Sequence, residues 1–229
     1  MFNELEKVID YSLENDNYIE ALENNVTGKK SADGIKQTAR FLSRIYHFNK
    51  TKASFKILKY FWQHIENDDK KIIVFLYALN TDYLLSESIN VVNETRIGDI
   101  ASVENFEKNV ELYYPNKFSK VTRHSIGKNL ASSWKQIGMI TGKTKNIRTQ
   151  PIVNYNMVAF AFIMAYLEGL RGDFIVTSKW IKALCLNESQ LRELAIEASK
   201  RGLIQYQFSG NVTSITCNEI LKKLEINDI

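Results

Sequence analysis

The fold is decided by residues 118–151, which read FSKVTRHSIGKNLASSWKQIGMITGKTKNIRTQP. Apolar side chains recur at helical spacing in the first half of this stretch, which predicts a helix with one buried face. They are Ile126, Leu130, Trp134 and Ile137. Ser119 or Thr122 can cap the start of this helix, and Gly138 can adopt the left-handed conformation that ends a helix. The helix is therefore expected to stop at Gly138.

A short hairpin is expected directly after this helix. Residues 139–141 suit a strand, residues 142–146 a turn and residues 147–149 a returning strand. Pro151 lacks the N–H that continued pairing would need. The stretch is interpreted as a helix followed by a wing, both in contact with nucleic acid.

Charge is distributed unevenly along the chain. The net charge is +4, from 30 basic and 26 acidic residues. No acidic residue lies between Glu111 and Glu168, whereas this interval holds eight Lys or Arg. Without those eight, 22 basic residues remain against 26 acidic ones, so the rest of the chain is net acidic. Phosphate backbones respond to such a local potential more than to the molecular total.

The predicted DNA-binding surface lies on this helix and its wing. Its candidate residues are Lys120, Arg123, His124, Lys128, Lys135, Lys143, Lys145 and Arg148. Lys120, His124, Lys128 and Lys135 share one flank in helical projection, next to the apolar face. The alternative is a solvated basic face that is balanced by acids brought near in the fold.

A second basic surface is predicted near the N-terminus. After Gly28, residues 29–59 hold nine Lys or Arg against the single Asp33. Ser31 is expected to cap a helix whose buried side contains Leu42. The candidate contacts are Lys29, Lys30, Lys36, Arg40 and Arg44. A solvated helix face explains this pattern as well as a nucleic-acid contact does.

A second helix–glycine–hairpin unit is expected near the C-terminus. Asn187 opens a predicted helix, Gly202 ends it, and residues 203–217 alternate like a hairpin. This second wing contains neither Lys nor Arg. It is expected to pack against protein, which makes the first unit the better DNA candidate. Residues 157–167 form the most apolar run, which belongs inside the protein and is too short to cross a bilayer.

The helical spacing and the two helix–glycine–hairpin units predict a mainly α protein, a helical bundle with two winged-helix-like units and short β-hairpins. The expected organisation is a helical domain over residues 1–115 and a second over residues 116–229, with one compact body as the alternative. Cys185 and Cys217 lie far apart and read as reduced, packed thiols, which fits a cytoplasmic protein. The N-terminus does not resemble a secretory signal.

Motifs of enzymes and metal sites are missing from the sequence. There is no phosphate-binding GxxxxGK[ST], no GxSxG and no HExxH. The sequence therefore predicts a protein that is not an enzyme and that has no cofactor, catalytic residue or metal site.

Several segments together resemble a known family. They are ALENNVTGKKS at 21–31, FLSRIY at 41–46, NLASSWKQIGMITGK at 129–143 and YLEGLRGD at 166–173, followed by Trp180 and Leu184. The chain is similar to the BrxA family of bacterial BREX phage-defence systems over most of its length. The resemblance implies a small, helical, non-enzymatic cytoplasmic protein with winged-helix character that binds double-stranded DNA. It also implies partners among other BREX proteins, including the methyltransferase.

The predicted function is weakly sequence-specific binding of double-stranded DNA in antiviral defence, with no membrane partner. Two alternatives stand beside it. One is an assembly scaffold whose basic face meets other defence proteins. The other is an RNA-binding bundle, because the chain also resembles the helical bundles of antitermination factors.

Overall fold

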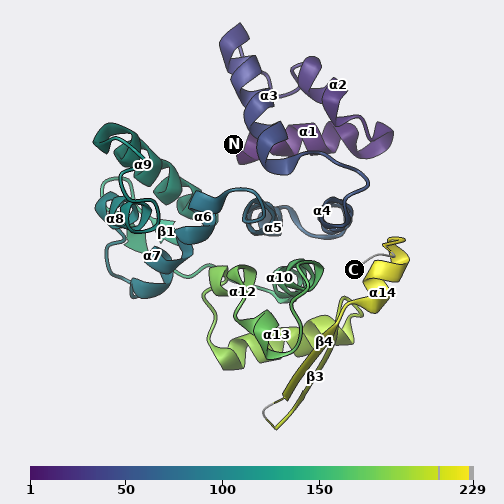
Figure 1. Cartoon of the computed structure of the whole chain (residues 1–229). Coiled ribbons are helices and arrows are strands. Elements are labelled where there is room, and N and C mark those ends of the chain that lie inside the picture. Colours follow the sequence, from purple (N-terminus) through teal and green to yellow (C-terminus); the bar gives the residue numbers. More distant parts are fainter. Residues whose placement is uncertain (211, 227–229) are drawn as a thin grey trace.

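The computed structural model describes residues 1–210 and 212–226, and it is mainly helical (Figure 1). The longer helices are α1 (Phe2–Asn15), α3 (Ala32–Tyr46), α4 (Ala53–His64), α5 (Asn67–Ala78), α8 (Val103–Tyr113), α9 (Lys120–Gln136), α10 (Tyr155–Leu167) and α13 (Glu188–Lys200). The shorter helices are α2 (Tyr18–Glu23), α6 (Tyr83–Glu87), α7 (Ile89–Glu94), α11 (Asp173–Val176), α12 (Lys179–Ala183) and α14 (Asn218–Lys223). Among the described residues, four strands form two antiparallel hairpins, β1 (Ile140–Thr141) with β2 (Ile147–Arg148) and β3 (Gln205–Ser209) with β4 (Val212–Thr216). The predicted mainly α fold with short hairpins is confirmed.

Helix α10 lies at the centre of the molecule. It packs against α4 and α5 on one side and against α12 and α13 on the other. Every residue from 157 to 166 is buried. The expectation that this apolar run belongs inside is confirmed, because a helix without a polar face must be covered all round.

The other elements are arranged around α10 and its neighbours. Helices α1–α3 cap one end of the molecule, and the β3–β4 hairpin extends from the opposite end (Figure 1). The C-terminal α14 returns towards α4, where Lys56 Nζ donates hydrogen bonds to the carbonyls of Leu224 and Glu225, each at 3.3 Å. Among the described residues, no single helix is both long and apolar enough to cross a membrane. Helix α5 and the segment Tyr83–Glu94 together meet the same criteria of length and composition, with a bend of 104° between them.

Packing crosses the expected domain boundary at residue 115. Helices α8 and α9, which flank that boundary, pack closely against each other. Helix α10 from the second half packs on α4 and α5 from the first half. The buried residues of both halves form one hydrophobic core. The two predicted halves therefore share a core.

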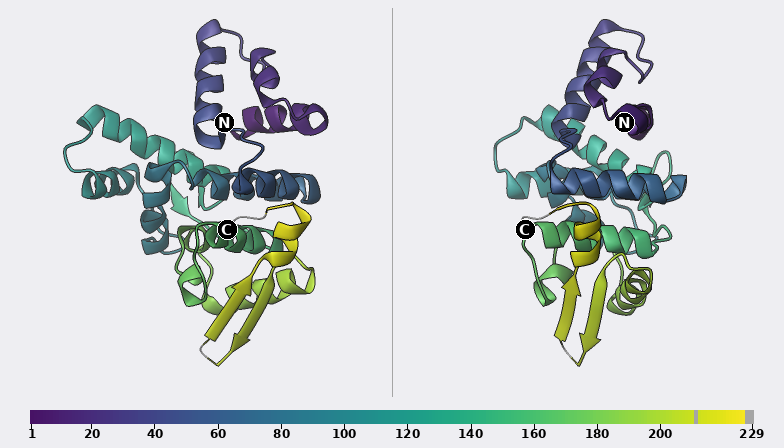
Figure 2. Two further views of the ribbon diagram at one scale, coloured as in Figure 1. Left: turned by 45° about the vertical axis from the view of Figure 1, so that its right-hand side comes forward. Right: turned by 90° about the vertical axis from the view of Figure 1, so that its right-hand side faces the viewer.

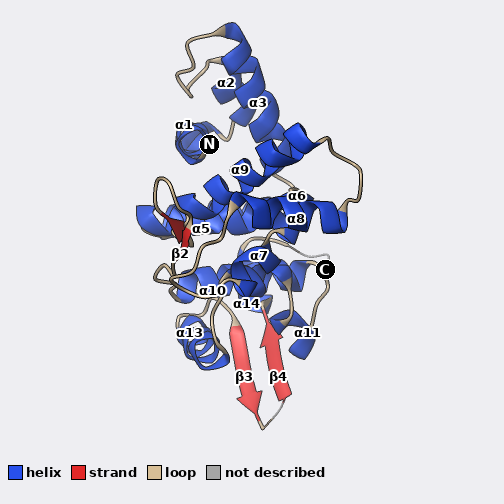
Figure 3. Cartoon of the chain, turned by 90° about the vertical axis from the view of Figure 1, so that its left-hand side faces the viewer, coloured by secondary structure: helices blue, strands red, loops and turns tan. Residues whose placement is uncertain are grey.

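The first predicted unit, over residues 118–151, consists of α9 and the β1–β2 hairpin. Ile100 forms an isolated antiparallel bridge with Ile147 of β2, and Ile147 pairs with Thr141 of β1. Helices α7 and α8 precede α9 in the chain, and the bridge at Ile100 joins the segment between α7 and α8 to the hairpin that follows α9. In the view of Figure 3, β2 lies to the left of α8 and α9.

Both ends of α9 lie where the sequence predicts them. The side chain of Ser119 accepts a hydrogen bond from the Thr122 N–H. At the other end Gly138 has a φ of 78°, and its N–H donates to the Lys135 carbonyl. The Met139 N–H donates to the Trp134 carbonyl. These two bonds form a Schellman motif, which satisfies carbonyls that the end of the helix leaves unpaired.

The second predicted unit is also present. Asn187 and Gln190 form a capping box at the start of α13, and Gly202 follows its end with a φ of 73°. Strands β3 and β4 pair from Gln205↔Thr216 to Ser209↔Val212. The predicted turn between them includes residue 211, which lies outside the described residues. The helix–glycine–hairpin succession is confirmed for the remainder of this unit.

Candidate nucleic-acid interface

A row of lysines follows one flank of α9. Lys120 and Lys128 are exposed, and Lys135 is half-buried. Within the part of the chain that the structure describes, none of the three forms an ion pair. Helices α8 and α9 project together from the rest of the molecule (Figure 2, left). The lysine row therefore lies on an accessible edge.

The buried face of α9 fixes the position of this row. Leu130, Trp134 and Ile137 are buried, as the helical spacing predicts, whereas Ile126 is half-buried. Gly127 faces α8, where a Cβ atom would lie 3.0 Å from the Val103 carbonyl oxygen. A larger residue at position 127 would push the two helices apart. Their close contact holds the lysine flank in a fixed orientation relative to α8.

Two of the predicted DNA-binding residues are compensated by acids of α8. The Arg123 guanidinium forms an ion pair with Glu111, and His124 Nδ1 lies 2.7 Å from Glu107 Oε1. The Asn116 N–H, together with Arg123, lowers the pKa of Glu111 and so favours its charged form. The fold thus brings negative charge to a stretch of sequence that contains none. Arg123 and His124 contribute less positive potential than the sequence suggests.

Arg148 is the one candidate of the first surface that is buried, with 3% of its surface exposed. Its Nε donates to the Val92 carbonyl at 3.0 Å, and Nη1 donates to the carbonyls of Met139 and Thr149. Its Nη2 donates to Gln150 Oε1 at 3.2 Å. The prediction that Arg148 contacts DNA is wrong, because its buried guanidinium donates its hydrogen bonds to α7, to the residues after α9 and to the wing itself.

The remaining wing residues lie at its tip. Lys143 and Lys145 are exposed, and neither forms an ion pair with residues 1–210 or 212–226. The turn that carries them is tight at Gly142, which has a φ of 95° and where a Cβ atom would lie 2.2 Å from the Lys145 carbonyl oxygen. Only glycine fits there. The tip therefore presents two accessible cations on the hairpin that follows α9.

The second basic surface is partly neutralised. Lys29 Nζ lies 2.7 Å from Glu4 Oε1, whereas Lys30 is exposed. The other candidates, Lys36, Arg40 and Arg44, are exposed at successive turns of α3. Ser31 caps this helix by accepting the Gly34 N–H, as predicted. Its basic face is therefore also available.

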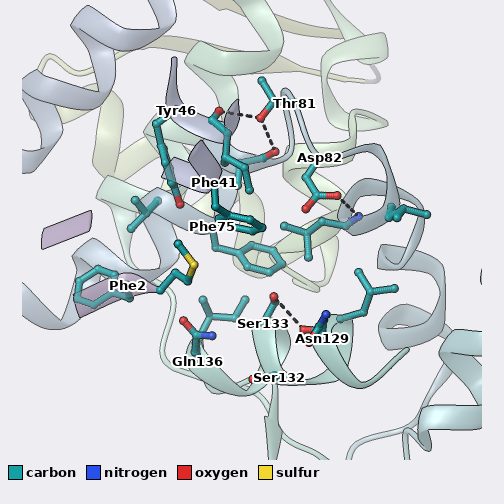
Figure 4. Close-up of a pocket in the computed structure, with 18 of the residues that line it drawn as sticks. Phe2, Phe41, Tyr46, Phe75, Thr81, Asp82, Asn129, Ser132, Ser133 and Gln136 are labelled. Atoms are coloured by element: carbon teal, nitrogen blue, oxygen red, sulfur yellow. Dashed lines mark hydrogen bonds between the residues drawn. The ribbon is translucent and has the colours of Figure 1, made fainter. Parts of the chain in front are cut away.

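The structure adds a cleft that the sequence does not indicate. It has a volume of about 650 Å³ and lies between α3, α5, α6 and α9. Its lining residues come from positions 1 to 137, and no local pattern links them. Phe41 and Phe75 lie on one wall, and Asn129, Ser133 and Gln136 lie opposite (Figure 4).

The second wing presents apolar rather than basic side chains. Val212 is 68% exposed, and Phe174 of the neighbouring α11 is 75% exposed. The Arg192 guanidinium lies 3.6 Å from the centroid of the Phe208 ring. Cys217 at the end of this wing is a free thiol, and burial raises its pKa to about 12. The expectation of packed, reduced cysteines is met for this thiol.

Comparison with protein-family models, with curated proteins and with solved structures finds no match to this chain.

Proposed function

We propose that the unit formed by α8, α9 and the first wing binds double-stranded DNA. The observation that carries this proposal is the set of cations without acid partners among the described residues on one winged-helix-like unit. They are Lys120, Lys128 and Lys135 on α9 and Lys143 and Lys145 on the wing. A helix and a neighbouring hairpin that both carry cations can contact the phosphates on either side of a groove.

The chemistry of this unit favours phosphate contacts over the reading of bases. Its accessible cations are lysines, which bind phosphate as point charges. Arg123 and Arg148, which could pair with guanine edges, are occupied by Glu111 and by backbone carbonyls. Binding is therefore phosphate-dominated and weakly sequence-specific.

The biological setting that we propose is bacterial phage defence of the BREX type. The support for it is the resemblance of residues 129–143 and 166–173 to the BrxA family. In this setting the chain acts in the cytoplasm without catalysis. Other BREX proteins, including the methyltransferase, are its proposed protein partners.

A salt titration tests duplex binding directly. With about four to five phosphate contacts, the affinity for random-sequence duplex DNA should fall by roughly two to three decades between 50 and 200 mM salt. The reason is that each neutralised phosphate releases counterions. Fluorescence anisotropy with a labelled duplex measures this slope. An affinity that does not depend on salt would contradict the proposal.

A pair of matched variants identifies the surface. Lys143→Gln with Lys145→Gln should leave the free energy of unfolding within about 0.5 kcal/mol of wild type. It should reduce the magnitude of the salt slope by about 2, one for each lost contact. Lys36→Gln with Arg40→Gln on α3 removes the same charge from the second surface and should leave the slope unchanged. If the α3 pair abolishes binding and the wing pair does not, α3 carries the interface.

Two observations keep the scaffold function as a second candidate. Arg123 and His124 are already paired with acids of α8, and exposed apolar residues lie on the second unit. If neither pair of substitutions changes duplex affinity while both variants stay folded, the scaffold should replace DNA binding. Competition between duplex DNA and structured RNA separates the RNA-binding alternative, since structured RNA would then displace the duplex.

A further inference from the structure

The cleft between α3 and α9 has the size and the lining of a small-molecule site. Its volume of about 650 Å³ falls within the roughly 300–1,000 Å³ that is usual for ligand pockets. One wall carries the rings of Phe41, which is half-buried, and Phe75, which also packs on Trp134 with ring centroids 4.6 Å apart, and the Phe2 ring lies apart from them (Figure 4). A ligand with a flat aromatic ring can stack on such a wall.

Two cations stand at aromatic rings of this cleft. The Arg44 guanidinium carbon lies 5.1 Å from the centroid of the Phe41 ring. Lys71 Nζ lies 5.9 Å from the centroid of the Phe2 ring. Both side chains are exposed, and neither has an ion-pair partner within residues 1–210 and 212–226. They can therefore bind an anionic group of a ligand.

The lining is net positive. Asp82 is the one carboxylate among the described lining residues. Its Oδ1 accepts the Leu85 N–H at 3.0 Å and thereby caps α6. The lining residues thus include two cationic side chains and one carboxylate, which already caps a helix. This balance of charge favours an anionic ligand.

The wall opposite Phe41, on α9, carries amides and hydroxyls beside the apolar Ile126, Leu130 and Ile137. The side chains of Asn129 and Gln136 line it, and their amide groups make no hydrogen bond within the part of the chain that is described. Amides of this kind both donate and accept, as do the edges of nucleobases. This wall can therefore recognise a base that is stacked on the opposite one.

We propose that the cleft is a nucleotide-binding site, in which an aromatic base lies between the Phe41 wall and α9 and a phosphate meets Arg44 or Lys71. This site is separate from the lysine row of α9 and does not rest on duplex binding. The nucleotide can come from solution or from a single strand, because both present the same base and phosphate.

Calorimetric titration of the full chain with AMP, adenosine and inorganic phosphate tests the proposal. AMP should bind at least about tenfold more tightly than adenosine or phosphate alone, since only AMP uses both the ring wall and the cations. Absence of saturable AMP binding at millimolar concentrations overturns the proposal. Equal affinity for AMP and inorganic phosphate overturns it as well, because the rings would then contribute nothing.

Variants locate the site. Arg44→Gln and Phe41→Leu should each weaken AMP binding by about tenfold with little change in melting temperature. Lys36→Gln, on the same helix but outside the cleft, should stay within about twofold of wild type. If Lys36→Gln weakens AMP binding as much as Arg44→Gln does, the effect is general surface charge and the proposal fails.

Two further experiments distinguish a single strand from a free nucleotide as the ligand, and nucleotide binding from duplex binding. If a short oligo(dA) strand binds more tightly than AMP, and Phe41→Leu weakens both to the same extent, the ligand is a single strand. If AMP binds more tightly than oligo(dA), the ligand is a free nucleotide. Lys120→Gln with Lys128→Gln should leave AMP affinity unchanged while it weakens duplex binding. Nucleotide binding and duplex binding can therefore fail independently.

Discussion

We expect Trp134→Ala to lower the free energy of unfolding by about 3–5 kcal/mol, because it leaves a large cavity beneath α9. The Trp134 side chain is completely buried, and its ring centroid lies 4.6 Å from that of Phe75. Its Nε1 donates to Ser88 Oγ at 2.8 Å. The substitution therefore removes packing and a buried hydrogen bond together.

Urea unfolding, followed by circular dichroism, measures this loss. Trp134→Phe is the matched control, because it keeps an aromatic ring at Phe75 but loses the bond to Ser88. Its cost should be smaller, about 1–3 kcal/mol, since a buried acceptor loses its donor and a smaller cavity remains. A Trp134→Ala variant that melts like wild type but no longer binds DNA would show that Trp134 belongs to the interface.

The sequence predicts the backbone of this region well because the signals are local. Ser119 reaches the N–H three residues ahead of it, and Gly138 closes a motif with the residues just before it. The spacing of Leu130 and Trp134 identifies the buried face without knowledge of what covers it. Each inference needs only one turn of helix, so the ends of α9 and the position of the wing follow from short windows of sequence.

The surroundings of the charged side chains could not be predicted in the same way. Glu107 and Glu111 lie outside the acid-free interval, and only the packing of α8 on α9 brings them to His124 and Arg123. The cleft depends on α3 and α9 approaching from distant parts of the chain. Charge that is counted along a sequence therefore overestimates the charge of a surface wherever another helix packs beside it.

Arg148 is the clearest case of this difference, and its substitution is expected to affect stability rather than binding. The Val92 carbonyl, its partner at 3.0 Å, precedes it by 56 positions. Arg148→Met keeps much of the side-chain volume but leaves the carbonyls of Val92 and Thr149 without this donor. Since each unsatisfied buried polar group costs about 1–3 kcal/mol, we expect the free energy of unfolding to fall by about 2–4 kcal/mol.

The matched comparison for Arg148→Met is the Lys143→Gln and Lys145→Gln pair, which lies in the same wing but on its exposed tip. Chemical denaturation should show a large loss for Arg148→Met and a change of at most about 0.5 kcal/mol for the tip pair. Salt-dependent duplex binding should show the opposite pattern under conditions in which both variants are folded. Opposite effects on stability and on duplex binding would distinguish Arg148, which stabilises the wing, from Lys143 and Lys145, which in our proposal bind phosphate. If Arg148→Met keeps wild-type stability and loses duplex binding, its guanidinium reaches phosphate and the structural role argued for it is wrong.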